Sequence, residues 1–243
     1  MKIDGRVVRA HERELLLDVA RREGIDIPTL CSVEGLEPSG ACRLCIVKVR
    51  RGGREKIVTS CNYPVEENIF VTTGDKKITR LRKTVLELLV ALAPASEKVR
   101  TMASRMGVEG GRLEAARRGN QCILCGLCVS VCDDIVGAHA ITFSGRGESK
   151  KVTLAFGENN LDACTGCGAC GFVCPTDCID MEQRKLDRLA AVWRKGERVC
   201  RYSLMGLLPG ALCDNDYDCA ACSLDRRMFE LVQGRHPAFL LKR

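Results

Sequence analysis

Residues 164–175 read Cys-Thr-Gly-Cys-Gly-Ala-Cys-Gly-Phe-Val-Cys-Pro, which places four cysteines at C-x2-C-x2-C-x3-C spacing ahead of a proline. Residues 122–132 carry the same cysteine spacing about 42 residues earlier. Three cysteines at two-residue intervals can hold three irons of a cubic cluster only if the backbone curls tightly. The repeat predicts two [4Fe–4S] clusters in one small domain. Four glycines in these motifs permit the curl: Gly126, Gly166, Gly168 and Gly171.

The fourth cysteine of each motif is expected to bind the other cluster, as in two-cluster ferredoxins. Two zinc sites are the alternative, but zinc ribbons rarely use three ligands at two-residue intervals. Asp133 follows Cys132 where a symmetrical ferredoxin has proline, which changes the turn but not the ligand. The crossed pattern assigns one [4Fe–4S] cluster to Cys122, Cys125, Cys128 and Cys174, and the other to Cys132, Cys164, Cys167 and Cys170.

A further cysteine group near the N-terminus has the spacing C-x10-C-x2-C-x15-C. The plant-type [2Fe–2S] pattern is C-x4-C-x2-C followed by a distant cysteine, so the first loop is longer here. Small residues at 39–41 suit a backbone that must approach a cluster closely. The spacing leaves [2Fe–2S] and zinc open for these four residues: Cys31, Cys42, Cys45 and Cys61.

The last cysteine group lies beyond the repeat and consists of Cys200, Cys213, Cys219 and Cys222. Four thiolates on a short loop-rich stretch suit a tetrahedral metal. Zinc is favoured, because three nearby aspartates would oppose an anionic cluster. A further [4Fe–4S] cluster and free or disulfide-linked thiols are the alternatives. The remaining Cys178 is interpreted as a small buried residue beside a cluster, and the aspartates are Asp214, Asp216 and Asp218.

The composition of the 243 residues supports metal binding in a reducing compartment. Hydrophobic residues make up 46%, which argues against disorder, and 17 residues are cysteine. The sequence shows no secretory signal and no apolar stretch of the ~18 residues that a membrane span needs. We therefore expect a cytoplasmic protein, where thiols stay reduced. The sequence has no dinucleotide-binding or phosphate-loop motif, so no flavin is expected in this chain.

The pattern of apolar residues divides the chain into four parts of mixed α and β character. Residues 1–77 predict short strands, a hairpin at 46–59 and one helix. Residues 78–118 predict two helices in a basic linker, and residues 76–118 carry eleven Lys or Arg and four Glu, a surplus of seven. Residues 119–185 contain the repeat, with strands expected at 140–143, 152–154 and 178–180. A basic helix is expected at 185–199, and the last part, residues 186–243, also holds the last cysteine group.

Several motifs resemble the N-terminal iron–sulfur region of the complex I large iron–sulfur subunit family. Its relatives include electron-transfer subunits of NAD-linked hydrogenases, [FeFe]-hydrogenases and NAD-dependent formate dehydrogenases. The resemblance covers residues 1–182, and the motifs occur in the same order. It is carried by residues 28–31 (Pro-Thr-Leu-Cys), 40–45 (Gly-Ala-Cys-Arg-Leu-Cys), 60–65 (Ser-Cys-Asn-Tyr-Pro-Val), 122–147 and 164–175.

The resemblance implies a β-grasp [2Fe–2S] ferredoxin domain, a helical linker and a two-cluster bacterial ferredoxin-like domain. Outside the resemblance, the last cysteine group predicts a small four-cysteine knuckle at the C-terminal end, and the whole chain is expected to be of the α+β class. The resemblance also implies an electron-transfer subunit, not an enzyme by itself, that relays electrons between partners. These would be a flavoprotein NADH-dehydrogenase-like subunit and a catalytic or acceptor subunit. Acceptors in related complexes include protons, CO2, ferredoxin, quinone and aromatic acyl-CoA reductases.

Two departures from the family limit this expectation. Many relatives hold a further [4Fe–4S] cluster with one histidine and three cysteines in the middle segment, but residues 78–118 contain neither residue type. Only about 60 residues follow the ferredoxin-like region, so any catalytic centre is expected on another chain. A cluster-based redox sensor and a nucleic-acid-binding protein are the competing functions, the second because of the local positive charge.

Overall fold

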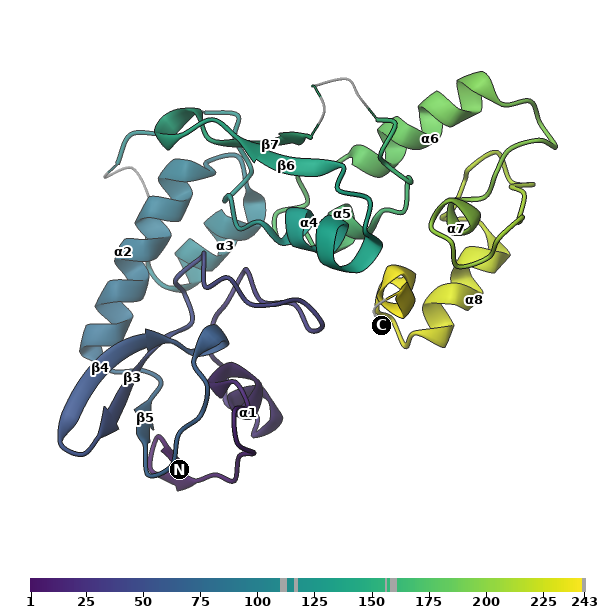
Figure 1. Ribbon diagram of the computed structural model, residues 1–243. Coiled ribbons are helices and arrows are strands. Elements are labelled where there is room, and N and C mark those ends of the chain that lie inside the picture. Colours follow the sequence, from purple (N-terminus) through teal and green to yellow (C-terminus); the bar gives the residue numbers. More distant parts are fainter. Residues whose placement is uncertain (110–112, 116–117, 156, 158–160, 242–243) are drawn as a thin grey trace. The chain divides into compact units, whose positions relative to one another are not determined.

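The structure of the chain is a computed structural model that describes residues 1–109, 113–115, 118–155, 157 and 161–241 (Figure 1). The chain forms two compact units, Met1–Cys125 and Gly126–Arg243. The boundary lies within the second cysteine group, directly after Cys125. Of the predicted basic segment, Arg112 and Arg117 lie outside the described residues.

A five-stranded sheet organises the first unit, with strands β1 (Lys2–Ile3), β2 (Arg6–Val7), β3 (Ile46–Arg51), β4 (Arg54–Thr59) and β5 (Phe70–Thr72). The strand order is β2-β1-β5-β3-β4. Strands β1 and β5 are parallel, and the other neighbours are antiparallel. Gly52 and Gly53 join β3 to β4 with positive φ at both positions, as a tight two-residue hairpin turn requires.

Helix α1 (Leu16–Arg22) packs its apolar residues into the core beside the sheet. Leu16 and Val19 are fully buried together with Val47 of β3. A short 3-10 helix, Ser60–Asn62, follows β4 and contacts α1. Cys45 and Cys61 are part of the same apolar core, so the sheet and α1 position half of the first cysteine group.

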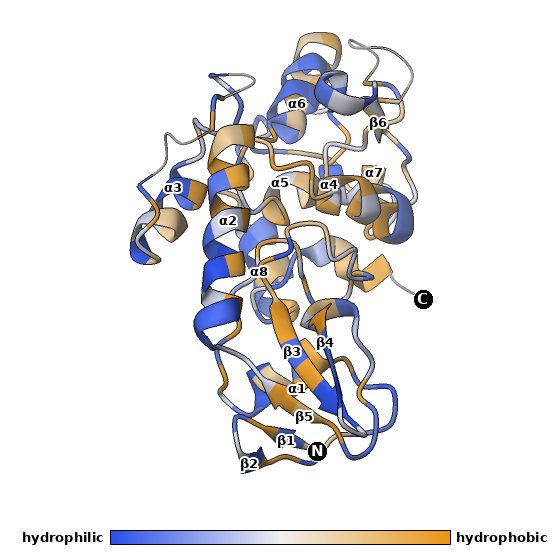
Figure 2. Ribbon diagram, turned by 90° about the vertical axis from the view of Figure 1, so that its left-hand side faces the viewer, coloured by the Kyte–Doolittle hydropathy of each residue, from blue (hydrophilic) through white to orange (hydrophobic). Residues whose placement is uncertain are grey.

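The basic segment after β5 folds into α2 (Lys76–Leu92) and α3 (Glu97–Arg105). Figure 2 shows that the first part of α2 is hydrophilic and the later part apolar. Leu86 and Leu89 of α2 and Val99 of α3 form a second core that includes Cys31 and Cys42. The expected linker helices therefore belong to the first compact unit and pack against its cysteines.

The second unit begins with helix α4 (Leu127–Ser130), which continues into a turn of π-helix at Val131–Val136. Strands β6 (Ile141–Ser144) and β7 (Lys151–Leu154) form an antiparallel pair, and a 3-10 turn at Gly147–Ser149 connects them. Helix α4 packs against β6 and against α5 (Ala169–Phe172). The later elements are α6 (Met181–Val192), α7 (Arg201–Leu204), α8 (Ser223–Leu231) and a 3-10 helix at Pro237–Leu241.

The predicted strand at 178–180 is wrong. Asp180 directly precedes the first residue of α6, and residues 178–180 pair with no strand among the described residues. The helix expected at 185–199 is displaced and covers Met181–Val192. In the part of the chain that the structure describes, no helix is both long and apolar enough to cross a membrane.

Candidate metal centres

The first cysteine group gathers in one buried region of the first unit. The four side chains are at most 3% exposed. Hydrogen bonds between thiols link Cys31 to Cys42 and to Cys61, and a further one links Cys45 to Cys61. The fold therefore joins four sulfurs from three separate loops into one connected group.

The environment of these sulfurs favours the ionised form of two of them. Hydrogen bonds from the Cys42 and Cys61 thiols lower the pKa of Cys31 to about 2. A hydrogen bond from Cys61 lowers the pKa of Cys45 to about 6, and the same contacts raise the pKa of Cys42 and Cys61. Thiolate is the form of cysteine that ligates metal.

Backbone amides around Cys42 also face the sulfurs. Cys42 N donates to Cys31 Sγ at 3.3 Å, and Leu30 N donates to Cys42 Sγ at 3.4 Å. Gly40 has a φ of 63°, and a Cβ at this position would lie 3.0 Å from Asn62 Nδ2. The loop thus needs glycine both for its conformation and for its close approach. Amides that donate to sulfur are among the features that set cluster potentials.

Arg82 of α2 holds the backbone on either side of Cys45, and the sequence analysis did not identify this role. Its side chain is 7% exposed, with Nε donating to Leu44 O at 3.0 Å and a terminal nitrogen donating to Ile46 O at 2.7 Å. Burial lowers the pKa of Arg82. The signal was present in the sequence, because Arg82 stands at helical spacing between the buried residues Ile78 and Leu86.

The first half of the second cysteine group lies at the end of the first unit. Asn120 organises this segment: its side-chain amide donates to Cys122 O at 2.9 Å, and its side-chain oxygen accepts from Cys122 N at 3.1 Å. Leu124 has a φ of 55°, and its amide donates to Cys122 Sγ at 3.3 Å. The Ser39 hydroxyl donates to Cys125 O at 3.4 Å.

In the second unit, four cysteines from both motifs line one cavity of about 330 Å³. Ala140 N donates to Cys132 Sγ at 3.3 Å, and Gly166 N donates to Cys164 Sγ at 3.4 Å. The Thr165 hydroxyl lines the same cavity, and among the described residues it is buried without a hydrogen-bond partner. The four are the set that the crossed pattern predicts for one cluster: Cys132, Cys164, Cys167 and Cys170.

Glycines shape the wall of this cavity. Gly166 and Gly168 have φ values of 68° and 82°. A Cβ on Gly168 would collide with the Glu182 carboxylate, and one on Gly166 would lie 3.2 Å from Leu186 Cδ2. The predicted tight curl is therefore confirmed at these two positions. Gly171 is not one of the glycines with positive φ, so it does not contribute to the tight backbone turn in this way.

Cys174 and Cys178 lie side by side in the second unit, with their sulfurs 3.7 Å apart. The hydroxyl of Thr176 is 3.4 Å from Cys178 Sγ and 3.6 Å from Cys174 Sγ. A hydrogen bond with Cys178 raises the pKa of Cys174. Cys178 thus lies beside a predicted ligand, where the sequence placed a small packing residue.

The last cysteine group lines a separate cavity of about 350 Å³ in the second unit. An antiparallel bridge between Val199 and Leu212 closes the long loop between its first two cysteines. Tyr217 N donates to Cys213 Sγ at 3.3 Å. The structure brings together the four side chains that the sequence grouped: Cys200, Cys213, Cys219 and Cys222.

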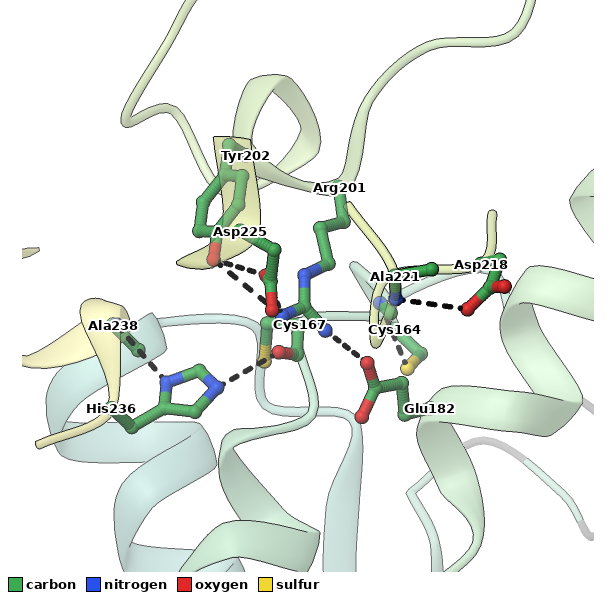
Figure 3. A network of polar contacts seen from close by, with 11 residues as sticks. Cys164, Cys167, Glu182, Arg201, Tyr202, Asp218, Ala221, Asp225, His236 and Ala238 are labelled. Carbon is green, nitrogen blue, oxygen red and sulfur yellow. Dashed lines mark hydrogen bonds and ion pairs between the residues drawn. The ribbon is translucent and has the colours of Figure 1, made fainter. Parts of the chain in front are cut away.

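A buried polar network lies on the wall of this second cavity (Figure 3). Arg201 is 5% exposed and forms ion pairs with Glu182 and Asp225. The Tyr202 hydroxyl donates to the same carboxylate of Asp225 at 2.5 Å. The sequence analysis missed this network, because its partners lie 19 to 24 residues from Arg201.

His236 also belongs to this region, and it is 2% exposed. Its Nε2 lies 3.0 Å from Cys167 O, and its Nδ1 accepts from Ala238 N at 3.1 Å. Burial lowers the pKa of His236 to about 4. The imidazole is therefore a neutral, hydrogen-bonded group that holds the Cys167 loop.

Comparisons with known proteins match two segments of the chain. Residues 1–76 match the family described as a 2Fe-2S iron-sulfur cluster binding domain, and residues 115–181 match the family described as a 4Fe-4S dicluster domain. Together they include the first three cysteine groups. The chain is similar to the N-terminal iron–sulfur region of the complex I large iron–sulfur subunit family.

Individual relatives agree with this family. The NADPH-Fe(3+) oxidoreductase subunit alpha of Geobacter sulfurreducens is 33% identical over 199 residues, which are 72% of this chain and 23% of that protein. The NADP-reducing hydrogenase subunit HndD of Solidesulfovibrio fructosivorans is 32% identical over 206 residues, 73% of this chain and 35% of that one. This chain therefore spans about a quarter of the length of the first relative and about a third of that of the second.

A solved structure shows the same relationship. A chain of an NAD+-reducing [NiFe]-hydrogenase in the H2-reduced state matches with a TM-score of 0.55 and 28% sequence identity. The match covers 63% of this chain and 74% of that chain. The chain itself thus combines mixed α and β structure with segments that match two iron–sulfur domain families.

Proposed function

We propose that the chain is the iron–sulfur electron-transfer subunit of a multi-subunit oxidoreductase. It relays single electrons between a flavin-containing, NAD(H)-oxidising subunit and a catalytic or acceptor subunit. The observation that carries the proposal is the set of three cysteine groups inside two matched iron–sulfur domains. The relatives, an oxidoreductase subunit and a hydrogenase subunit, support the same function.

The ligand assignments follow the sequence pattern, and the site geometry supports them. The first group fits a [2Fe–2S] cluster, because its sulfurs form one connected, buried group that receives backbone N–H donors. The cavity of the third group fits one [4Fe–4S] cluster, because four cysteines line it and backbone N–H groups donate to two of their sulfurs. The remaining [4Fe–4S] cluster is assigned from the motif to Cys122, Cys125, Cys128 and Cys174. We assign the mixed sheet with α1 to the β-grasp type.

Each bound cluster would supply reversible one-electron chemistry, whereas NADH delivers a hydride to a flavin. The chain's own residues set the conditions for that chemistry. Buried amides donate to sulfur at the first and third groups, and Arg82 places a positive charge beside the first. These contacts favour the negatively charged sites and keep water away from them.

Nucleic-acid binding fits the basic segment less well. Lys76, Lys77 and Arg80 of α2 are exposed, but Arg82 of the same helix is committed to the first cysteine group. The apolar residues of α2 and α3 form a core with Cys31 and Cys42. The segment therefore has a structural role within the iron–sulfur unit, and its exposed charges suit a protein partner.

Iron analysis after anaerobic purification tests the proposal. We expect about ten Fe in the first three cysteine groups, with electron paramagnetic resonance signals of both [2Fe–2S] and [4Fe–4S] type. A flavoprotein subunit should co-purify from the native host. A preparation with two Fe or fewer per chain would contradict the proposed relay. A sensor, by contrast, would retain the iron but pass no electrons from the flavoprotein to an added acceptor.

A further inference from the structure

The cavity of the last cysteine group lies outside both matched segments. We propose that its four cysteines hold a further [4Fe–4S] cluster, which extends the electron path from the cavity of the third group. This inference rests on the proposed function, because it takes the third-group cavity as a cluster site. The ligands would be Cys200, Cys213, Cys219 and Cys222.

Size is the first argument. The two cavities lie in the same compact unit, and each is lined by four cysteines. The two cavities are of similar size. The first belongs to the segment that matches a 4Fe-4S dicluster domain. A cavity of similar size and equal ligand number suits the same group.

A single zinc ion is the alternative occupant of this cavity. Zinc binds thiolate sulfur at ~2.3 Å, so it would draw the four sulfurs into mutual contact around one ion. Metal analysis separates the two occupants.

One unused donor in this cavity points to an anionic occupant. Arg201 lines the cavity, and its Nε is buried without a hydrogen-bond partner among the described residues. Tyr217 N donates to Cys213 Sγ, as Gly166 N does to Cys164 Sγ in the other cavity. A four-thiolate cluster with net negative charge would accept from such donors.

The structure offsets one of the three aspartates that favoured zinc in the sequence, whereas Asp214 and Asp218 line the cavity. Asp216 does not line the cavity and pairs with Arg198 and with Lys195 at 3.1 Å. One oxygen of Asp218 accepts from Ala221 N at 3.2 Å. Asp214 remains exposed to water, which screens its charge. The electrostatic objection to a cluster is thereby reduced.

One ion pair connects the walls of the two cavities. Glu182 lines the third-group cavity, whereas Arg201 and Asp225 line the other. Arg201 pairs with both carboxylates (Figure 3). The two cavities are therefore neighbours, as electron exchange requires. An electron that moves between them oxidises one cluster and reduces the other by one electron, with no further reactant.

Metal analysis of the full chain tests the inference. The wild-type chain and a Cys213→Ser/Cys219→Ser variant are purified anaerobically and reconstituted with iron, sulfide and zinc together. We expect about 14 Fe and no stoichiometric zinc in the wild type, and about ten Fe in the variant. Ala220→Ser is the control, because it introduces serine into the same loop at an exposed position that does not line the cavity and removes no thiol. In the reduced wild type, magnetic interaction between neighbouring clusters should broaden the [4Fe–4S] resonance signal, and the double variant should lose the part of the broadening that the further cluster causes.

The wild-type counts separate the inference from the function on which it rests, even where the variant does not fold. About ten Fe with one zinc per chain would overturn the further cluster and leave the proposed function intact. About ten Fe without zinc would overturn it as well. Two Fe or fewer would remove both the relay and its extension.

Discussion

The first and last cysteine groups are held together by different physical means. The first group lies between two apolar cores, and its side chains are at most 3% exposed. In the last group only Cys200 is buried, and the other three cysteines are partly exposed. Its surroundings are charged, with Arg201 between two carboxylates. Apolar packing therefore stabilises the first group, whereas ion pairs stabilise much of the surroundings of the last group.

The difference concerns how each site tolerates change. An apolar core distributes its free energy over many contacts, so a single small deletion removes only part of it. A buried ion-pair network depends on each member, because the loss of one charge leaves the others uncompensated. Substitutions of single arginines should therefore affect the last group more than the first.

The largest effect is expected from Arg201→Met. The change leaves Glu182 and Asp225 without their shared cation, and such a loss costs about 3–5 kcal/mol in buried networks. We expect a lower unfolding temperature for the second unit and weaker metal retention at the last group, measured by calorimetry and iron analysis. The first group should retain its two Fe.

Lys195→Met is the matched control for this experiment. Lys195 pairs with Asp216 on the surface, where its side chain is 76% exposed. A pair of this kind contributes about 0–1 kcal/mol. Equal destabilisation by the two substitutions would show that burial of the Arg201 network has no special importance.

An intermediate effect is expected from Arg82→Met in the first unit. The substitution keeps a long apolar side chain but removes the donors to Leu44 O and Ile46 O. A buried carbonyl without a partner costs about 1–3 kcal/mol. We expect a moderate loss of stability and faster loss of the [2Fe–2S] absorbance on exposure to a chelator. Arg80→Met, on the exposed side of the same helix, should leave both unchanged.

The sequence predicted the parts that depend on local spacing. The first and last cysteine groups, each of which the structure brings together, follow from the intervals between cysteines. The hairpin at β3 and β4 follows from Gly52 and Gly53. The glycine curl at Gly166 and Gly168 is local in the same sense. In each case a pattern of a few residues determines the backbone, so no distant partner was needed.

The features that the sequence analysis missed or predicted wrongly depend mainly on contacts with residues distant in the sequence. Arg82 finds its carbonyl acceptors 36 and 38 residues away, so its position on an apolar helix face had no visible explanation. The sequence analysis treated Asp216 as a charge that would repel an anionic cluster, whereas in the fold it pairs with Arg198. Residues 178–180 look like a strand by composition, but Asp180 precedes a helix that packs against α5.

The smallest effect is expected from Ser96→Ala at the start of α3. The Ser96 side chain is 2% exposed and accepts from Val99 N at 3.4 Å, which caps the helix. Loss of such a cap costs about 1 kcal/mol. Since α3 packs in the core that contains Cys31 and Cys42, the unfolding temperature of the first unit should fall slightly while its iron content is unchanged. Thr101→Ala, exposed on the same helix, controls for helix propensity. A loss of iron in Ser96→Ala would show that the first group depends on single polar contacts, as the last group does.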